Sequence, residues 1–175
     1  MQIKKVLAEI NQMQRDGVIT SYAIGWAVGA TFYLEPSATL DIDIFVGFEA
    51  RPGSRLISPQ PIYDYLTGRG HTVRGEHIEI SGWPVQFLPP TGPLAEEALA
   101  ESCATDVDGE PTRVFSAEHL VAIALETGRA KDMAPILQFV DAGVLDADKM
   151  DGILARHGLA SRWASFEQRF LGDLP

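Results

Sequence analysis

The spacing of hydrophobic residues predicts both helices and strands in the first half of the chain. Apolar residues at helical intervals between Ile3 and Met13 predict an amphipathic first helix, which ends at the turn signal Asp16-Gly17. Strands are expected over residues 22–24, 40–48, 77–80 and 83–88, and short helices over residues 27–33 and around 62–66. Ser81-Gly82 predicts the turn of a hairpin between the last two strands.

From Pro93 onward the hydrophobic pattern is helical. Helices are expected over residues 94–104, 117–126, 132–140, 146–156 and 160–171, and Ser116, Asp132 and Asp146 stand where N-caps belong. The acidic stretch 106–111 is interpreted as a linker. We therefore predict an α+β (α/β) protein with an α/β core in residues 1–92 and a helical region packed on it in residues 93–175.

Composition narrows the class of protein. A chain of 175 residues with 46% hydrophobic and 22% charged residues is typical of a soluble globular domain. Its net charge of -10 disfavours broad binding of nucleic acid, which depends on clusters of Lys and Arg. The single Cys103 excludes an internal disulfide, and no apolar run is long enough to cross a membrane. No signal-peptide pattern is found, so a cytoplasmic location is expected.

Asp41 and Asp43 interrupt one of the most apolar stretches of the chain. Because side chains alternate along a strand, both carboxylates should project from one face, with Ile42 and Ile44 on the other. Two carboxylates on one face repel each other, and a divalent cation between them would reverse that effect. A solvated polar face opposite a buried one explains the same alternation without a metal.

The residues upstream favour the metal-binding interpretation. Gly25 is expected where a strand ends and a helix begins, a place where backbone N–H groups can hold phosphate. The order of strand, Gly, helix and a strand with Asp-x-Asp would present phosphate donors and a carboxylate pair to one ligand. Mg²⁺ bound by carboxylates and substrate phosphates suits that arrangement.

At these residues the sequence resembles the minimal nucleotidyltransferases of the DNA-polymerase-β-like superfamily. The resemblance rests on "YAIGWAVGATFY", "PSATLDIDIFV", "PVQFLPP", "LAEEAL" and "HLVAIALETGRAKD" and is strongest with uncharacterised bacterial members and abortive-infection-type toxins. It implies a mixed β-sheet flanked by helices, followed by a C-terminal helical segment. It also implies transfer of a nucleotidyl group from a nucleoside triphosphate to an unknown acceptor (protein, small molecule or RNA) with release of pyrophosphate. The likeness to toxins implies a toxin-antitoxin pair, with an antitoxin protein as the partner.

The resemblance assigns roles to particular residues of this chain. It implies that Asp41 and Asp43 are catalytic and hold Mg²⁺ or Mn²⁺, while Gly25, Trp26 and Ala27 form the phosphate-binding turn.

A second set of residues is expected to face the triphosphate. In the related toxins a Lys-Asp pair after a helix belongs to the active region, and Lys131-Asp132 stands at that place. Lys131 is a candidate catalytic residue that would bind the triphosphate as a compact cation, and Arg129 is a weaker candidate for the same role. A surface lysine beside a helix-capping Asp132 explains the pair as well.

Three departures from the superfamily pattern leave two functions open. Trp26 replaces the second Gly, Ala27 lacks a hydroxyl group, and Gln86 stands at the place of the third carboxylate, where it can offer a metal only its carbonyl oxygen. Glu79 is a substitute acid or else an exposed residue of an alternating strand. The alternative to a working transferase is a catalytically degenerate nucleotide-binding or regulatory module. The histidines show no zinc-site spacing and are expected to be surface or supporting residues.

Overall fold

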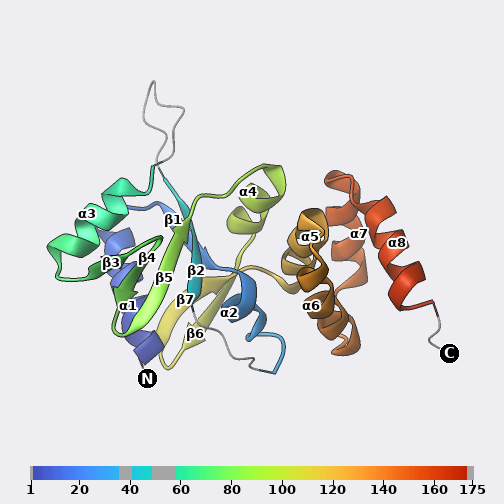
Figure 1. Cartoon of the computed structure of the whole chain (residues 1–175), viewed down its shortest axis with the longest axis horizontal. Coiled ribbons are helices and arrows are strands. Elements are labelled where there is room, and N and C mark those ends of the chain that lie inside the picture. Colours follow the sequence, from blue (N-terminus) through green and yellow to red (C-terminus); the bar gives the residue numbers. More distant parts are fainter. Residues whose placement is uncertain (1, 36–40, 49–57, 173–175) are drawn as a thin grey trace.

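The computed structural model describes residues 2–35, 41–48 and 58–172 and shows a mixed β-sheet with helices on its faces and a helical C-terminal part (Figure 1). The strands are β1 (Ser21–Ile24), β2 (Ile42–Gly47), β3 (Thr72–Arg74), β4 (His77–Ile80), β5 (Trp83–Leu88), β6 (Cys103–Val107) and β7 (Glu110–Val114). These described strands form one seven-stranded sheet in the order β3-β4-β5-β2-β1-β7-β6. The predicted fold class, a mixed sheet flanked by helices, is confirmed.

The centre of the sheet sets the position of the aspartates. β2 runs antiparallel to β1 and parallel to β5, and Asp43 is paired with Gln86 in the β2–β5 register. On the other side of β1, β7 is parallel to it. Strand β2 is therefore covered by a neighbour at both edges, which fixes which way each of its side chains points.

The helices are α1 (Gln2–Arg15), α2 (Trp26–Ala30), α3 (Gln60–Gly68), α4 (Pro93–Ala100), α5 (Ala117–Thr127), α6 (Ala130–Asp141), α7 (Ala147–Arg156) and α8 (Ala160–Phe170). α1 and α3 cover one face of the sheet, where Ile42, Ile44 and Val46 of β2 are fully buried with apolar residues of both helices. Within the described part of the chain, no helix has the length and apolar character needed to span a membrane.

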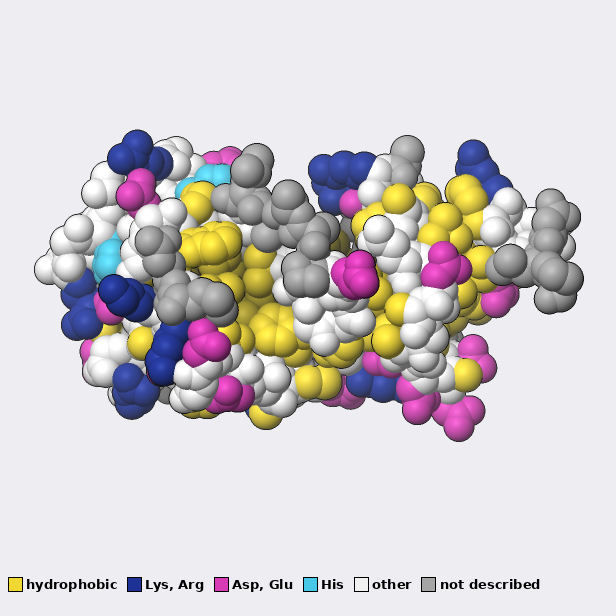
Figure 2. Space-filling view, turned by 90° about the horizontal axis from the view of Figure 1, so that it is seen from below, with side chains coloured by type: hydrophobic (Ala, Val, Ile, Leu, Met, Phe, Trp, Pro, Cys, Tyr) yellow, Lys and Arg dark blue, Asp and Glu magenta, His cyan; other side chains and the backbone are white. Residues whose placement is uncertain are grey.

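The other face of the sheet carries Phe45 and packs against α4 and α5. Every residue of α5 from Ala117 to Leu125 is buried, because the sheet side, α4, α6 and α7 surround this helix. The helices α6, α7 and α8 extend the molecule away from the sheet (Figure 1). On the face seen in Figure 2, hydrophobic side chains run along the middle of the molecule and charged side chains lie mostly around its edge.

The stretch interpreted as a linker is instead a β-hairpin. β6 and β7 pair in antiparallel register, and Asp108 and Gly109 form the turn with φ angles of 54° and 81°. Asp-Gly with two positive φ angles is a favoured two-residue hairpin turn, and the Gly109 N–H donates to Asp106 Oδ1 over 2.9 Å. The helix expected over 94–104 therefore ends at Ala100, and the sheet takes two strands from beyond residue 92.

Two of the three predicted helix caps are present. Ser116 Oγ accepts from the His119 N–H, and Asp146 Oδ1 accepts from the Lys149 N–H. Asp132 was expected to cap α6, but Arg129 occupies the N-cap position and Asp132 lies inside the first turn. Its carboxylate instead binds the Arg129 guanidinium, with Nε and Oδ2 2.7 Å apart.

Candidate active site

A cleft of about 520 Å³ lies between the sheet with α2 on one side and α5 with α6 on the other. Its polar lining includes Glu35, Asp41, Asp43, Gln86, Arg129, Lys131 and Asp132, and its apolar lining includes Trp26, Ala30, Leu34, Leu88, Leu120, Ala124, Pro135 and Phe139. Of the residues to which the sequence assigned a role in the site, all except Gly25 and Glu79 line it. The cleft is thus charged at one part of its wall and apolar at another.

The aspartates reach the cleft because β2 alternates as predicted. Ile42 and Ile44 are fully buried on the α1 side of the sheet, so Asp43 projects from the opposite face, half-buried. Asp41 lies directly before β2 and also lines the cleft. The structure therefore brings both carboxylates to one ligand-sized space.

The environment of Asp43 makes its charge costly. Burial, and then the neighbouring Asp41 carboxylate, raise the pKa of its carboxyl group to about 6, while His77 acts in the opposite direction. The negative charges of Asp41 and Asp43 therefore repel each other, and His77 offsets this repulsion only in part. A bound cation would relieve that repulsion.

The glycine turn differs from the expectation in one respect. Gly25 is buried beneath the turn, and its N–H donates to the Asp43 carbonyl over 3.1 Å, so this group is already used within the fold. A Cβ atom at position 25 would meet Phe45 Cε2 at 2.5 Å, which explains the glycine by packing. Of the predicted turn, it is Trp26 and Ala27 that line the cleft.

Trp26 has a backbone conformation that rarely suits a large residue. Its φ angle is 45°, in the left-handed region that favours glycine. Its indole lies against Phe45, with ring centroids 6.1 Å apart, and faces the cleft at the same time. The indole therefore packs partly into the core and narrows the space beside the turn.

The opposite wall carries the cations. Arg129, Lys131 and Asp132 stand at the start of α6 and line the cleft, and Lys131 is exposed. The Arg129 guanidinium is bound by Asp132, which leaves Lys131 as the more accessible of the two positive groups.

The two candidates for the third acid have different surroundings. Gln86 lies beside Asp43 across the parallel strands and lines the cleft. Glu79 is paired with Arg74, with Oε2 and Nε 2.9 Å apart, at the β3 side of the sheet. Glu79 is thus held by an arginine outside the cleft lining.

His77, at the start of β4, is the residue near the site that the sequence did not single out. Its Nε2 lies 3.4 Å from Asp41 Oδ2, and this atom is buried without a hydrogen-bond partner among the described residues. The proximity depends on β4 being separated from β2 by β5 alone. The alternation of His77 with the buried Ile78 could predict the face of the sheet from which His77 projects. It could not predict which residues of other strands lie beside it.

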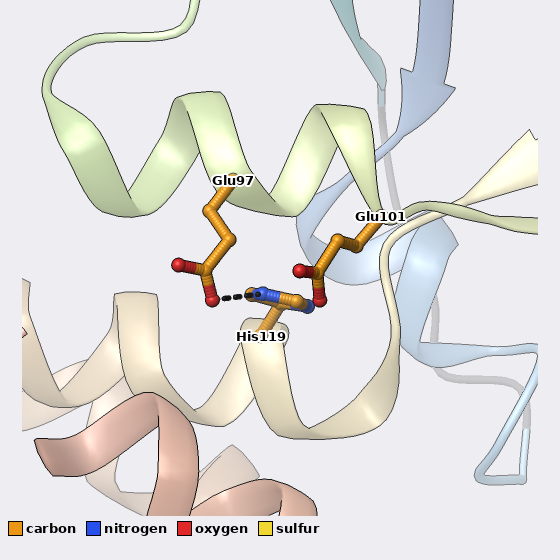
Figure 3. A group of neighbouring side chains, drawn as sticks. All are labelled: Glu97, Glu101 and His119. Carbon is orange, nitrogen blue, oxygen red and sulfur yellow. Dashed lines mark hydrogen bonds and ion pairs between the residues drawn. The ribbon is translucent and has the colours of Figure 1, made fainter. Parts of the chain in front are cut away.

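A second group of potential ligands lies away from this cleft, between α4 and α5 (Figure 3). Glu97, Glu101 and His119 offer ligand atoms that lie within 4.8 Å of one another. Glu97 is already bound by Arg156 and His157, at 2.7 and 2.8 Å, and it contacts His119 at 3.3 Å. These contacts make Glu97 the centre of an ion-pair network that joins α4 to α5 and α7.

Comparison with known proteins finds similar solved structures but no similar sequence family. No protein-family model and no curated protein sequence matches the chain. The crystal structure of ANT(2'')-Ia in complex with adenylyl-2''-tobramycin is 16% identical and has a TM-score of 0.55 over 97% of this chain and 99% of the other. An antigenic nucleotidyltransferase-like protein from Paracoccidioides brasiliensis is 14% identical, with a TM-score of 0.58 over 95% and 92% of the two chains. The solution structure of ANT(2'')-Ia, described as an antibiotic-resistance factor, is 20% identical, with a TM-score of 0.50 over 95% and 96%.

These likenesses extend over nearly the whole chain, and the identities of 14 to 20% make them evidence about the fold. The sheet, the helices on its faces and the C-terminal helices are all included in the matched length. The chain therefore has a nucleotidyltransferase fold.

Proposed function

We propose that the protein is a nucleotidyltransferase that binds a nucleoside triphosphate with Mg²⁺ or Mn²⁺ in the cleft and transfers a nucleotidyl group to an acceptor. The observation that carries the proposal is that Asp41 and Asp43 line the same cleft as Arg129 and Lys131. Carboxylates on one wall and cations on the other suit a ligand that consists of a divalent metal and phosphates.

The donor set fits a divalent cation. Two carboxylates line the cleft, and burial and the neighbouring Asp41 carboxylate raise the pKa of Asp43 to about 6. When bound, the metal would neutralise charge on the triphosphate and favour displacement at the α-phosphorus. Asp41 and Asp43 would hold it there.

The side chains of the cleft would also bind the triphosphate and position it for transfer. Lys131 would bind the triphosphate from the opposite wall and orient it. An acceptor oxygen or nitrogen would form a bond to the α-phosphorus while the bond to the bridging oxygen breaks, and pyrophosphate would leave with that oxygen. The amide of Gln86 cannot accept the acceptor's proton, so this proton would pass to water.

Calorimetry with ATP, GTP, CTP and UTP in the presence of Mg²⁺ tests the binding site. Wild type should bind at least one triphosphate, and the double variant Asp41→Ala/Asp43→Ala should lose that binding. Asp64→Ala/Asp151→Ala removes two exposed acids on α3 and α7 and is the matched control for charge. Equal binding in wild type and in the Asp41/Asp43 variant, or no binding in either, would rule the proposal out.

A second candidate function is a nucleotide-binding or regulatory module that no longer transfers. It is favoured by the Trp26 indole beside the turn and by the neutral Gln86 next to Asp43. Incubation with labelled triphosphate distinguishes the two candidates. Binding without transfer of label to any acceptor, including the protein's own Ser, Thr and Tyr residues, would favour the module.

A further inference from the structure

Two carboxylates stand at the C-terminal end of α4, where a helix favours positive charge. Glu97 lies in the last turn, and Glu101 is the C-cap residue, whose N–H donates to the Glu97 carbonyl over 2.8 Å. Side chains four residues apart lie on one face of a helix, so these acids repel each other and the negative end of the helix dipole. The last turn of α4, all of which is described, contains no basic residue. A cation bound between the two carboxylates would offset this repulsion.

The imidazole of His119 meets both carboxylates from α5 (Figure 3). His119 is fully buried, and its Nε2 lies 3.3 Å from Glu97 Oε1. Its other ring nitrogen, Nδ1, lies 2.8 Å from Oγ of Ser116, the N-cap residue of α5. When Nδ1–H donates to this oxygen, the lone pair of Nε2 is available to a metal ion. A histidine that binds a metal is commonly held in this way, through a hydrogen bond of its second ring nitrogen.

The three ligand atoms are close enough to share one ion. The two carboxylate oxygens and the imidazole nitrogen all lie within 4.8 Å of one another. Two ligands of a tetrahedral Zn²⁺, each about 2.1 Å from it, lie roughly 3.4 Å apart, and the 3.3 Å between Glu97 and His119 matches this separation. Glu101 is exposed, and its carboxylate accepts no side-chain hydrogen bond from the described residues. Rotation of its side chain can therefore close the remaining distance.

The other contacts of Glu97 are compatible with a bound metal. The Arg156 guanidinium donates to Oε1 over 2.7 Å, and His157 Nε2 lies 2.8 Å from Oε2. Each carboxylate oxygen has two lone pairs, so Glu97 can accept these hydrogen bonds and still bind an ion. Hydrogen bonds of this kind orient the carboxylates that bind metals in proteins.

We propose that Glu97, Glu101 and His119 form a binding site for Zn²⁺ or a similar divalent transition-metal ion, which joins α4 to α5. We call it the helix-junction site. Imidazole together with carboxylates suits such ions, and three protein ligands leave one position of a tetrahedral ion for water. The site lies away from the cleft, and the inference does not rest on the proposed function. Because α5 also carries Leu120 and Ala124 of the cleft wall, the ion would hold that wall in place.

Calorimetry with Zn²⁺ tests the site in the full chain. The Asp41→Ala/Asp43→Ala variant is the background, so that these carboxylates of the cleft cannot bind the ion, and it is expected to bind Zn²⁺. Adding Glu101→Gln should weaken this binding by about 10-fold or more, because it removes a charged ligand. The exposed position of Glu101 makes a folding defect unlikely to confuse the result, and circular dichroism checks the fold. Glu96→Gln removes the same charge from an exposed neighbour on α4 and should leave the affinity unchanged.

Two further measurements in the same background test the imidazole and the effect on the fold. Nuclear magnetic resonance of the imidazole nitrogens should show a Zn²⁺-dependent shift of His119 Nε2, and His119→Gln identifies its signal. Zn²⁺ should also raise the melting temperature, because an ion that binds only the folded state stabilises it, and Glu101→Gln should reduce this rise.

Equal Zn²⁺ affinity with and without Glu101→Gln would overturn the inference, as would an unshifted His119 signal or no Zn²⁺ binding in the background variant. Each of these results concerns the helix-junction site alone. The proposed function is tested separately by triphosphate binding in the cleft, so its failure would be distinguishable from the failure of this inference.

Discussion

Asp43 of β2 and Gln86 of β5 are paired in the parallel register at the centre of the sheet, and both side chains line the cleft. This relationship puts an uncharged amide next to the more buried carboxylate of the site. An acid at position 86 would stand beside Asp43 as a third carboxylate. The pairing therefore identifies position 86 as a place where one more negative charge can be added to the proposed metal site.

Gln86→Glu is expected to raise the affinity for Mg²⁺ with triphosphate by about 10-fold, because a third carboxylate adds attraction for a divalent ion. Calorimetry measures the change. Gln138→Glu adds the same charge on the α6 wall of the cleft and is the matched control. An equal gain in both variants would mean that only the overall charge of the cleft matters.

Asp43→Asn is expected to stabilise the metal-free protein in a pH-dependent way. The pKa of Asp43 is raised from its usual value near 3.8 to about 6 in the folded state, so ionising it opposes folding. This penalty is absent below about pH 4, grows between pH 4 and 6, and is complete above pH 6. The side chain keeps some contact with solvent, which reduces the effect. We therefore expect the difference in free energy of unfolding between the variant and wild type to grow by about 1–2 kcal/mol from pH 4.5 to pH 7.5.

Urea denaturation with EDTA at the two pH values measures this gain. Asp64→Asn, an exposed acid on α3, is the control and should show no comparable pH dependence. A gain for Asp43→Asn that is the same at both pH values would contradict the role of ionisation. The same variant should bind Mg²⁺ and triphosphate more weakly than wild type, because it lacks one of the two carboxylates.

Gly25→Ala is expected to destabilise the fold by about 2 kcal/mol, because the new methyl group would overlap the Phe45 ring. That ring is buried and packs against Phe115, with centroids 4.7 Å apart, so it has little freedom to move. In a Phe45→Leu background the cost of Gly25→Ala should fall, and a double-mutant cycle measures the coupling.

Gly68→Ala is the control for Gly25, since no atom lies within 4 Å of the added carbon at the end of α3. It should be neutral or slightly stabilising. An equal cost of Gly25→Ala in the presence and absence of the Phe45 ring would show that the ring is not the reason for the glycine.

Trp26→Gly is expected to bind triphosphate several-fold more tightly than wild type. Glycine suits the φ angle of 45°, and loss of the indole opens the cleft beside the turn. Trp26→Ala removes the indole but keeps the unfavourable backbone, so it should be less stable than Trp26→Gly by about 1 kcal/mol. Weaker binding by both variants would indicate that the indole contacts the ligand instead of obstructing it.

Hydrophobic periodicity was sufficient to predict most helices and the central strands. The alternation around Asp43 correctly placed Ile42 and Ile44 on the buried face, because a strand covered on one side has only one arrangement that buries its apolar residues. The β6–β7 hairpin was missed because its strands are short and polar at an edge of the sheet. Asp108-Gly109 was the available signal, and it was interpreted as part of a linker.

The site was predictable where its residues follow one another in the chain, and not where strand order brings them together. Asp41 and Asp43 were singled out from their spacing, and they line one cleft with Lys131, while their role in binding a metal stays a prediction. The contact between His77 and Asp41 requires β5 to lie between β4 and β2, which no local pattern reveals. The packing reason for Gly25 likewise depends on Phe45, a residue of another strand.

The carboxylate of Glu97 connects three helices beyond the cleft and should stabilise the fold only when it is ionised. Its hydrogen bonds with Arg156, and then those with His157 and His119, lower its pKa from 4.5 to about 2 although burial acts in the opposite direction. This stabilisation is complete above about pH 4.5 and is lost as the pH falls toward 2.

Glu97→Gln should therefore lower the free energy of unfolding by about 1 kcal/mol at pH 7, a value reduced for the solvent contact of the ion pair, and the difference from wild type should vanish near pH 2. Urea denaturation across this range measures it, and Glu96→Gln, an exposed neighbour on α4, serves as the control. Because Glu97 ties α4 to α5, whose Leu120 and Ala124 line the cleft, its loss should also weaken triphosphate binding slightly at neutral pH. A stability difference that persists unchanged at pH 2 would show that the carboxylate acts through its shape and not through its charge.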